Sequence, residues 1–410
     1  MKRKLMAAMA VISTITIMIS GCGLKNNDVQ TANEYVGNEA SNEDSAEDDA
    51  ASVSSIVVME GLSEPTFEES SASASTSTVD KPAESNEDQV VMVFFGDSQI
   101  ASGRGDGTDI PTLVSQRVPH SVVYNLAIGG TTAALEASSS SVDPATMNSD
   151  SFIGMAYAYS GQADRNAVLA SHPEVLETMN KIDPAKVDYY VIEYGANDFF
   201  SGNPIDYTQY DGDNKIHAYY DAMCSGISIL KNMSPNAKII VMTPFYGIYK
   251  DTNDTFIGDT YVVSNGYGTL ADYAKKAKNV SEDEGCIDFD GMFREHSDLY
   301  LDTAEQYLID GVHLTLTGRQ IFARLLAHIP NFYEGYEPYA YLERDNIEIG
   351  NFNPDEYFRF RHDLMQQYYP EAWAKMQNGE YLLAPPVTQE EIDASSVQAA
   401  NESAQEQQQQ

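Results

Sequence analysis

Residues 90–99, VVMVFFGDSQ, decide the fold class of this chain. Apolar side chains follow one another without alternation up to Phe95, and such a run is typical of a strand that is covered on both faces of a parallel sheet. The run stops abruptly at Gly96-Asp97-Ser98. Because ligands and catalytic groups of parallel sheets gather beyond the carboxyl ends of the strands, Ser98 stands where this fold would carry a reactive side chain.

Similar apolar runs alternate with helical patterns along the rest of the chain. Strands are predicted at 122–126, 189–194 and 238–242, and a fifth strand is predicted to begin at Ile287. Helices are predicted at 111–118, 165–181, 215–232, 268–284 and 317–328, and residues 137–161 are predicted to form a loop insertion. This alternation without an internal repeat predicts an α/β fold, in which a mostly parallel central sheet is the middle of three α/β/α layers.

The two ends of the chain differ in composition from the part between them. The start, MKRKLMAAMAVISTITIMISGC, has a basic head, an apolar stretch and a small-residue site, which is the layout of an export signal and is short for a membrane span. Residues 23–88 are rich in Ser, Ala, Glu and Asp, so they are predicted to be a disordered tether, and residues 388–410 are predicted to be a disordered tail.

Residues 19–22, ISGC, resemble a bacterial lipobox. The resemblance implies that residues 1–22 are a lipoprotein signal peptide and that Cys22 becomes the lipidated first residue of the mature protein. The protein would then be held by its lipid on the extracytoplasmic face of a bacterial membrane. The alternative is an ordinary cleaved signal peptide.

Residues 89–332 are predicted to form a catalytic domain, and the aromatic-rich residues 333–387 an appendage that packs over the core or borders the cleft. The formal net charge of −38 argues against nucleic acid as a partner, because binding it requires basic residues that neutralise phosphates. The sequence contains no CxxC pair and no HExxH helix, so it carries no zinc signature.

Four predicted loops carry the groups that nucleophilic catalysis requires. The hydroxyl of Ser98 is a weak nucleophile and needs a base, for which His313 is suited near neutral pH. Asp310, three residues earlier, could orient that imidazole. The backbone N–H groups of Ser98 and Gly130, together with the neutral amide of Asn197, could donate hydrogen bonds to the oxyanion of a tetrahedral intermediate.

These residues lie in four blocks that resemble those of the GDSL, or SGNH, hydrolase family. The blocks are GDS at 96–98, NLAIGGTT at 125–132, GAND at 195–198 and DGVHLT at 310–315. Gln99 replaces the aliphatic residue that gives the family one of its names. By spacing within the second block the oxyanion glycine is Gly130, with Gly129 as the alternative.

The resemblance implies a flavodoxin-like three-layer fold that works without a metal or another cofactor. It also implies a catalytic triad of Ser98, His313 and Asp310, and an oxyanion hole formed by Ser98, Gly130 and Asn197. The substrates would be carboxylic esters, and the exported, tethered context favours O-acetyl groups on carbohydrate over short-chain lipid esters.

Two other functions remain compatible with the sequence. An O-acyltransferase acting on cell-envelope glycan would use the same five residues. A surface-binding or adhesion lipoprotein would not require a nucleophile, a base and oxyanion donors in one place. Residues 104–106 spell the adhesion tripeptide RGD, but their place after the nucleophile predicts a loop that shapes the cleft. The other histidines lack an acid at a matching spacing and are predicted to be structural or surface residues: His120, His172, His217, His296, His328 and His362.

Overall fold

A computed structural model describes residues 89–136, 141–209, 212, 214–251, 253–354 and 362–381 of the chain. The predicted signal peptide with Cys22, the tether and the tail lie outside these residues. Within the described ranges, no helix is long and apolar enough to cross a membrane.

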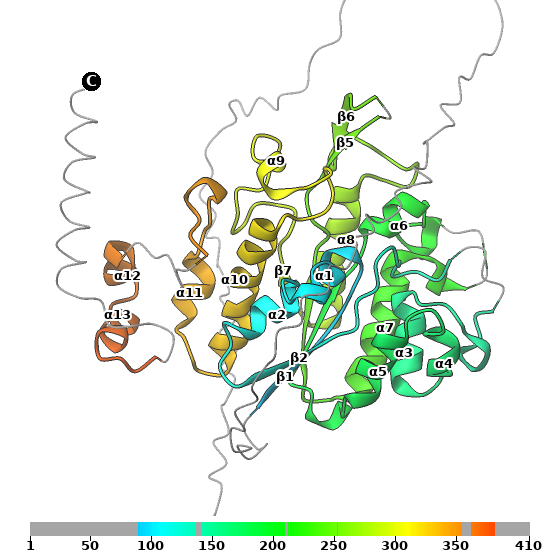
Figure 1. Cartoon of the computed structure of the whole chain (residues 1–410), viewed down its shortest axis with the longest axis horizontal. Helices are drawn as coiled ribbons and strands as arrows, with labels where there is room; N and C mark the ends of the chain where they lie inside the picture. Colours follow the sequence, from blue (N-terminus) through cyan, green and yellow to red (C-terminus); the bar gives the residue numbers. More distant parts are fainter. Residues whose placement is uncertain are drawn as a thin grey trace, which may run out of the picture. The chain divides into compact units, whose positions relative to one another are not determined.

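Five parallel strands form the central sheet, in the order β2-β1-β3-β4-β7 (Figure 1). They are β1 (Val90–Gly96), β2 (Ser121–Asn125), β3 (Tyr189–Glu193), β4 (Lys238–Met242) and β7 (Ile287–Phe289). Every residue of β3 is buried, as expected for an inner strand with helices on both faces. The α/β class and the parallel sheet predicted from the sequence are therefore confirmed.

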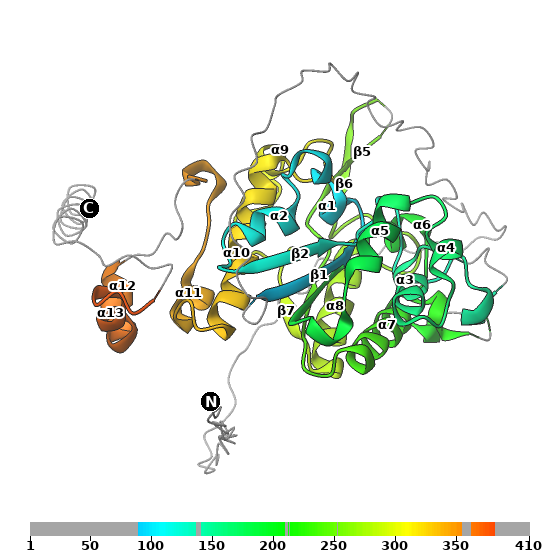
Figure 2. The ribbon, with the colours of Figure 1, turned by 60° about the horizontal axis from the view of Figure 1, so that its bottom comes forward.

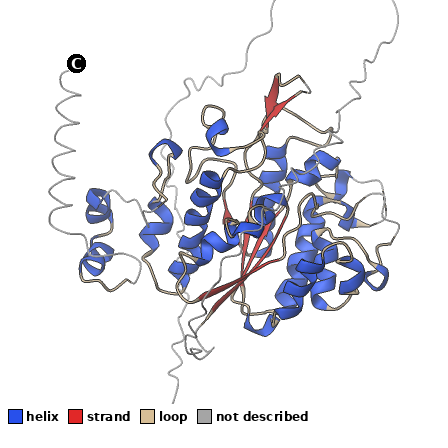
Figure 3. Cartoon of the chain, in the orientation of Figure 1, coloured by secondary structure: helices blue, strands red, loops and turns tan. Residues whose placement is uncertain are grey.

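Helices cover both faces of this sheet (Figures 1, 2 and 3). On one face α2 (Ile110–Ser115) packs against α10 (Leu316–Tyr333). On the other face α7 (Tyr219–Met233) lies between α3 (Phe152–Ser160) and α8 (Leu270–Glu284). Shorter α-helices complete this part: α1 (Ser98–Ala101), α4 (Arg165–Val168), α5 (Pro173–Lys181), α6 (Ala196–Ser201) and α9 (Ala304–Tyr307).

Three segments differ from the predicted elements. Helix α3 lies inside the predicted loop insertion, and it is apolar all round, so it shows no helical periodicity. The helix predicted at 165–181 is two helices, because Pro173 begins the second one. A two-stranded antiparallel hairpin, β5 (Ile248–Lys250) and β6 (Phe256–Asp259), was not predicted and projects away from the central sheet (Figure 1).

The aromatic-rich segment begins at the end of the sheet opposite Ser98. Glu334, just after α10, accepts a hydrogen bond from Tyr189 Oη at 2.6 Å, and Tyr189 is the first residue of β3. The segment then forms α11 (Tyr339–Arg344), α12 (His362–Tyr368) and α13 (Pro370–Gln377). These helices share a small core of their own: Ala340, Tyr341, Met365, Trp373 and Met376.

A buried ion cluster, defined by Arg324, His328, Glu337 and Asp345, joins this segment to α10. Arg324 donates to both oxygens of Asp345, from Nε at 2.8 Å and from Nη2 at 2.9 Å. His328 lies between two acids, with Nε2 2.8 Å from Asp345 Oδ2 and Nδ1 2.5 Å from Glu337 Oε1. All four side chains are buried, so each charge depends on its partners and not on water.

Candidate active site

Ser98 lies on a tight turn between β1 and α1. Gly96 ends the strand, and a Cβ added there would lie 2.6 Å from Ile100 Cγ1, so only glycine fits. Asp97 then caps α1, because its carboxylate accepts the Gln99 N–H at 2.9 Å. The turn leaves Ser98 half-buried at the carboxyl end of the sheet, where the sequence predicted a reactive group.

The structure brings Ser98, His313 and Asp310 into one chain of hydrogen bonds. Ser98 Oγ lies 2.9 Å from His313 Nε2, although the two residues are 215 positions apart. His313 Nδ1 lies 2.7 Å from Asp310 Oδ2. The other oxygen of Asp310 accepts the backbone N–H groups of Val312 at 3.0 Å and His313 at 2.8 Å, which fixes the carboxylate within its own loop.

The charges of this chain suit a general base. Hydrogen bonds from His313 and from two backbone N–H groups hold the pKa of Asp310 well below its usual range, against the opposing effect of burial. The hydrogen bond to Asp310 raises the pKa of His313. An ionised Asp310 accepts a hydrogen bond from Nδ1–H of His313. The neutral imidazole therefore carries its proton on Nδ1 and presents the lone pair of Nε2 to Ser98.

The second block brings Gly129 beside the serine, and Gly130 follows it in the chain. An ideal Cβ on Gly129 would lie 3.7 Å from Ser98 Cβ, and both Gly129 and Gly130 are exposed. Among the described residues, the backbone N–H groups of Ser98 and Gly130 donate to no other backbone group. The Gly129 N–H likewise donates to no other backbone group among the described residues, so both the expected oxyanion glycine and its alternative keep an N–H that an anionic oxygen could accept.

Asn197 lies near the same place, but its amide is already hydrogen-bonded. Its Nδ2 donates to Asp97 Oδ2 and to the carbonyl oxygen of Thr131, each at 3.1 Å. Rotating the amide by half a turn would place its oxygen against two acceptors. Asn197 Nδ2 is thus held between Asp97 and Thr131. To donate a hydrogen bond to an oxyanion as well, one of its N–H groups would have to be shared between two acceptors.

A buried pair of carboxyl groups, Asp97 and Glu193, lies behind this turn. Both side chains are fully buried. They are neighbours because Gly96, just before Asp97, pairs with Glu193 at the ends of β1 and β3. Asp97 has donors in Gln99 and Asn197, whereas the described residues offer no donor to either oxygen of Glu193. Burial raises the pKa of Asp97 to about 6, and burial and the neighbouring Asp97 raise the pKa of Glu193 well above its ordinary value. Burial and the charge of Asp97 therefore favour the protonated form of Glu193, which can donate a hydrogen bond to Asp97.

Asp198, the last residue of the third block, links this block to the second. Its oxygens accept the backbone N–H groups of Ala133 at 2.8 Å and Ala134 at 3.0 Å. Asn203 Nδ2 donates to the same carboxylate at 3.0 Å. Burial raises the pKa of Asp198 to about 6, and the three donors favour its ionised form.

The RGD segment forms a short 3₁₀ turn, η1 (Arg104–Asp106), that is fastened to the core. Arg104 Nη2 donates to Asn125 Oδ1 at 3.0 Å and to the carbonyl oxygen of Ala127. The guanidinium is turned inward, toward the start of the second block. This arrangement agrees with a loop that shapes the cleft and does not display the tripeptide.

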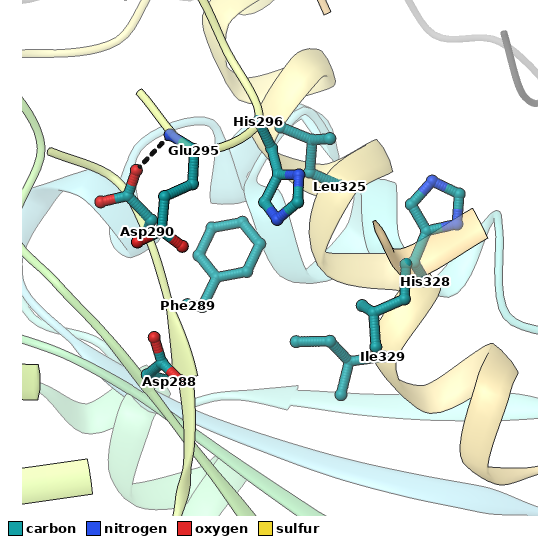
Figure 4. A pocket seen from close by; sticks show the side chains of 9 residues that line it. Asp288, Phe289, Asp290, Glu295, His296, Leu325, His328 and Ile329 are labelled. Atoms are coloured by element: carbon teal, nitrogen blue, oxygen red, sulfur yellow. Dashed lines mark hydrogen bonds between the residues drawn. The ribbon is translucent and has the colours of Figure 1, made fainter. Parts of the chain in front are cut away.

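Two histidines predicted to lack an acid have one. His172 Nε2 lies 3.1 Å from Asp150 Oδ2, and His328 belongs to the buried ion cluster. His328 also borders an enclosed cavity of about 40 Å³, shown in Figure 4 with His296 and Glu295. Neither Ser98 nor His313 lines this cavity, and a space of that size holds little more than a water molecule.

Comparisons with known proteins identify a family for most of the described core. Residues 94–321 match the model of the GDSL-like lipase/acylhydrolase family. A search of curated proteins finds no match. Similar solved structures include a possible lipase from Chitinophaga pinensis, at 18% identity and a TM-score of 0.40, covering 60% of this chain and 98% of that one. They also include Est24, a carbohydrate acetylesterase from Sinorhizobium meliloti, at 14% identity and a TM-score of 0.34, covering 59% of this chain and 98% of that one.

Proposed function

The chain belongs to the GDSL-like lipase/acylhydrolase family and is an ester hydrolase of that family, and we propose that Ser98, His313 and Asp310 carry out the hydrolysis. The observation that carries the assignment is the hydrogen-bonded chain from Ser98 Oγ through His313 to Asp310, at 2.9 Å and 2.7 Å. In this arrangement Nε2 of His313 faces the serine hydroxyl, and Nδ1 faces the carboxylate of Asp310. The hydrogen bond from His313 to the ionised Asp310 favours transfer of the serine proton to His313, against the opposing effect of burial.

In the proposed reaction Ser98 Oγ attacks the ester carbonyl carbon while His313 Nε2 takes the hydroxyl proton. The oxyanion of the tetrahedral intermediate accepts hydrogen bonds from the N–H groups of Ser98 and Gly130 and a shared N–H of Asn197. Collapse expels the alcohol, which leaves with the proton from Nε2, and Ser98 remains acylated. Water then attacks the acyl group, His313 takes and returns a proton, and the free acid departs.

Hydrolysis of p-nitrophenyl acetate tests these roles. The parent is expected to turn the ester over, and Ser98→Ala and His313→Ala are each expected to lower kcat by about 10³-fold or more. A fluorophosphonate should label the parent at Ser98 and leave Ser98→Ala unlabelled. A Ser98→Ala variant with the parent's kcat would refute the assignment.

For the substrate, we propose O-acetyl groups on carbohydrate. Phe200 follows Asn197 by one turn of α6 (Ala196–Ser201), is 42% exposed, and contacts Tyr249 of the hairpin edge-on with ring centroids 5.8 Å apart. An exposed ring beside the site suits stacking on a sugar face.

Kinetics on an acetylated glycan and on a small ester distinguish recognition of the sugar from hydrolysis of the ester. Phe200→Ala is expected to raise KM for an O-acetylated xylan about tenfold while leaving kcat and KM for p-nitrophenyl acetate unchanged. Phe256→Ala, an exposed phenylalanine on β6, is the matched control and should change neither substrate. Preference for long-chain esters would refute the carbohydrate proposal, and acetyl transfer to an added glycan would favour the acyltransferase alternative.

We also propose that Cys22 anchors the protein to the outer side of a bacterial membrane through lipid. The support is the lipobox-like ISGC sequence after an apolar stretch. In cells fed a labelled palmitate, the parent is expected to become labelled and to sediment with membranes. Cys22→Ala is expected to do neither, and an equally labelled Cys22→Ala protein would refute the anchor.

A further inference from the structure

Gln99, the residue after the proposed nucleophile, is hydrogen-bonded on both sides of His313. Its Nε2 donates to the carbonyl oxygen of Val312 at 2.7 Å, and its Oε1 accepts the N–H of Leu314 at 3.2 Å. The Gln99 side chain is only 3% exposed, so water has little access to replace these bonds. A single side-chain amide thus holds the backbone before and after the histidine.

The segment that carries the histidine, here called the histidine loop (residues 308–314), is anchored at its buried ends, Leu308 and Leu314, and is exposed between them. Its Ile309 is 70% exposed, and the side chains of His313 and Asp310 are 35% and 39% exposed. Within the loop, the Ile309 N–H donates to the His313 carbonyl oxygen at 2.8 Å. From outside, the hairpin residue Ile248 donates its N–H to the Gly311 carbonyl oxygen at 2.8 Å.

We propose that Gln99 is a positioning residue that fastens the histidine loop to the serine turn and so sets the approach of His313 Nε2 to Ser98 Oγ. The inference rests on the proposed function, because positioning matters only if this pair transfers a proton. The His313–Asp310 hydrogen bond lies entirely within the loop. Gln99 therefore governs the geometry between serine and histidine and leaves the geometry between histidine and aspartate alone.

An aliphatic side chain at this position, which the GDSL name records, can form neither bond. Gln99→Leu would keep most of the buried volume and leave the Val312 carbonyl and the Leu314 N–H without their partner. The two sides of His313 would then be free to move relative to α1. Because catalysis is sensitive to ångström-scale misplacement of a base, kcat should suffer more than substrate binding.

The first test compares Gln99→Leu with the parent on p-nitrophenyl acetate. We expect kcat to fall about 10- to 100-fold, with KM unchanged. The acid limb of the pH–rate profile should stay in place, because the His313–Asp310 pair is intact. Gln306→Leu, an exposed glutamine on α9, is the control and should keep the parent's kcat.

The second test uses Gln99→Glu, whose protonated carboxyl can donate and accept as the amide does, whereas its ionised form cannot donate to Val312. The titratable groups around it are Asp97 and Glu193 at the strand ends, and His313 with Asp310 on the loop. The activity of this variant relative to the parent should therefore fall as pH rises through the pKa of the introduced carboxyl. Recovery of the Gln99→Glu activity toward the parent's at low pH would show that a hydrogen-bond donor to the Val312 carbonyl oxygen is required at this position.

The third test does not depend on turnover. Hydrogen exchange at the Leu314 amide should be slow in the parent and at least tenfold faster in Gln99→Leu, beyond any acceleration that the variant's loss of global stability causes at core amides. Unchanged exchange, a parental kcat in Gln99→Leu, or a shifted acid limb in that variant would each overturn the inference. A parent that is as inactive as Ser98→Ala would instead refute the proposed function, and the exchange rates would still decide whether Gln99 holds the loop.

Discussion

Replacing Asp310 by asparagine should both slow the reaction and move its pH dependence. Asp310 Oδ1 accepts two backbone N–H groups, so an asparagine at this position keeps its oxygen there and turns its NH₂ group toward His313 Nδ1. His313 would then carry its proton on Nε2, facing Ser98, and could not accept the hydroxyl proton. Loss of the correct tautomer in a serine triad lowers kcat by about 10⁴-fold, and we expect a loss of about 10²- to 10⁴-fold here.

The shift in pH dependence follows from the charge that is removed. Two unit charges about 4 Å apart interact by about 1 kcal/mol in water and about 4 kcal/mol at an effective dielectric constant near 20. The side chains of His313 and Asp310 are 35% and 39% exposed, so the lower part of that interval applies. About 1 to 2 kcal/mol corresponds to about one pKa unit. Asp310 raises the pKa of His313, so the acid limb should lie above about pH 6.5 in the parent and move about one unit lower in Asp310→Asn.

Initial rates on p-nitrophenyl acetate across the neutral pH range measure both effects. Asp251→Asn is the matched control, because Asp251 is an exposed turn carboxylate that also accepts two backbone N–H groups, from Asn253 and Thr255, but has no histidine. It should leave kcat and the acid limb unchanged. An Asp310→Asn variant with an unmoved acid limb and a kcat within about threefold of the parent would refute the reasoning.

Four further outcomes are expected. Ser98→Ala should remove ester turnover at an unchanged thermal midpoint, since among the described residues the half-buried Ser98 Oγ is hydrogen-bonded to His313 alone. Glu193→Gln should flatten the pH dependence of stability: the pKa of Glu193 is raised, so the parent loses stability as pH rises above about 4.5, and urea unfolding at pH 5 and pH 8 compares the slopes. In His328→Gln the loss of stability should be largest below about pH 6.5, about 3 kcal/mol, and should vanish as pH rises through the parent pKa of about 9; a constant difference would contradict the charged histidine. Gly311→Ala should cost about 1 to 3 kcal/mol and lower kcat, because φ is +88° and a Cβ would lie 2.4 Å from a hairpin carbonyl oxygen; unaltered unfolding would contradict this strain.

The fold and the principal site residues could be predicted because their signals are local. The inner strands β1, β3 and β4 are apolar runs, and each of the four blocks follows its strand or precedes its helix within a few residues. Helix α3 could not be predicted in the same way, because seven of its nine residues are buried and no polar face marks its period. The broken helix at Pro173 was readable in principle from the proline itself.

The rest of the site depends on contacts that no local pattern contains. Glu193 ends an apolar strand, and it meets Asp97 only because the register of β1 and β3 pairs Gly96 with Glu193. Gln99 was visible as a departure from the family motif, but its partners are 213 and 215 positions away. The acids that contact His328 lie 9 and 17 positions further along the chain, Glu337 in the turn after α10 and Asp345 at the end of α11, so no local spacing indicated them.

The buried ion cluster has a consequence for where this protein can be divided. A chain cut after α10 would leave Arg324 and His328 as cations in an apolar interior without Asp345 and Glu337, and a broken buried pair costs about 3 to 5 kcal/mol. That is a large share of the stability of a single domain. Residues 334–345 must therefore be kept with the catalytic domain in any fusion, truncation or domain exchange. Helices α12 and α13, whose buried contacts are with α11, are the part that can be exchanged without disturbing these charges.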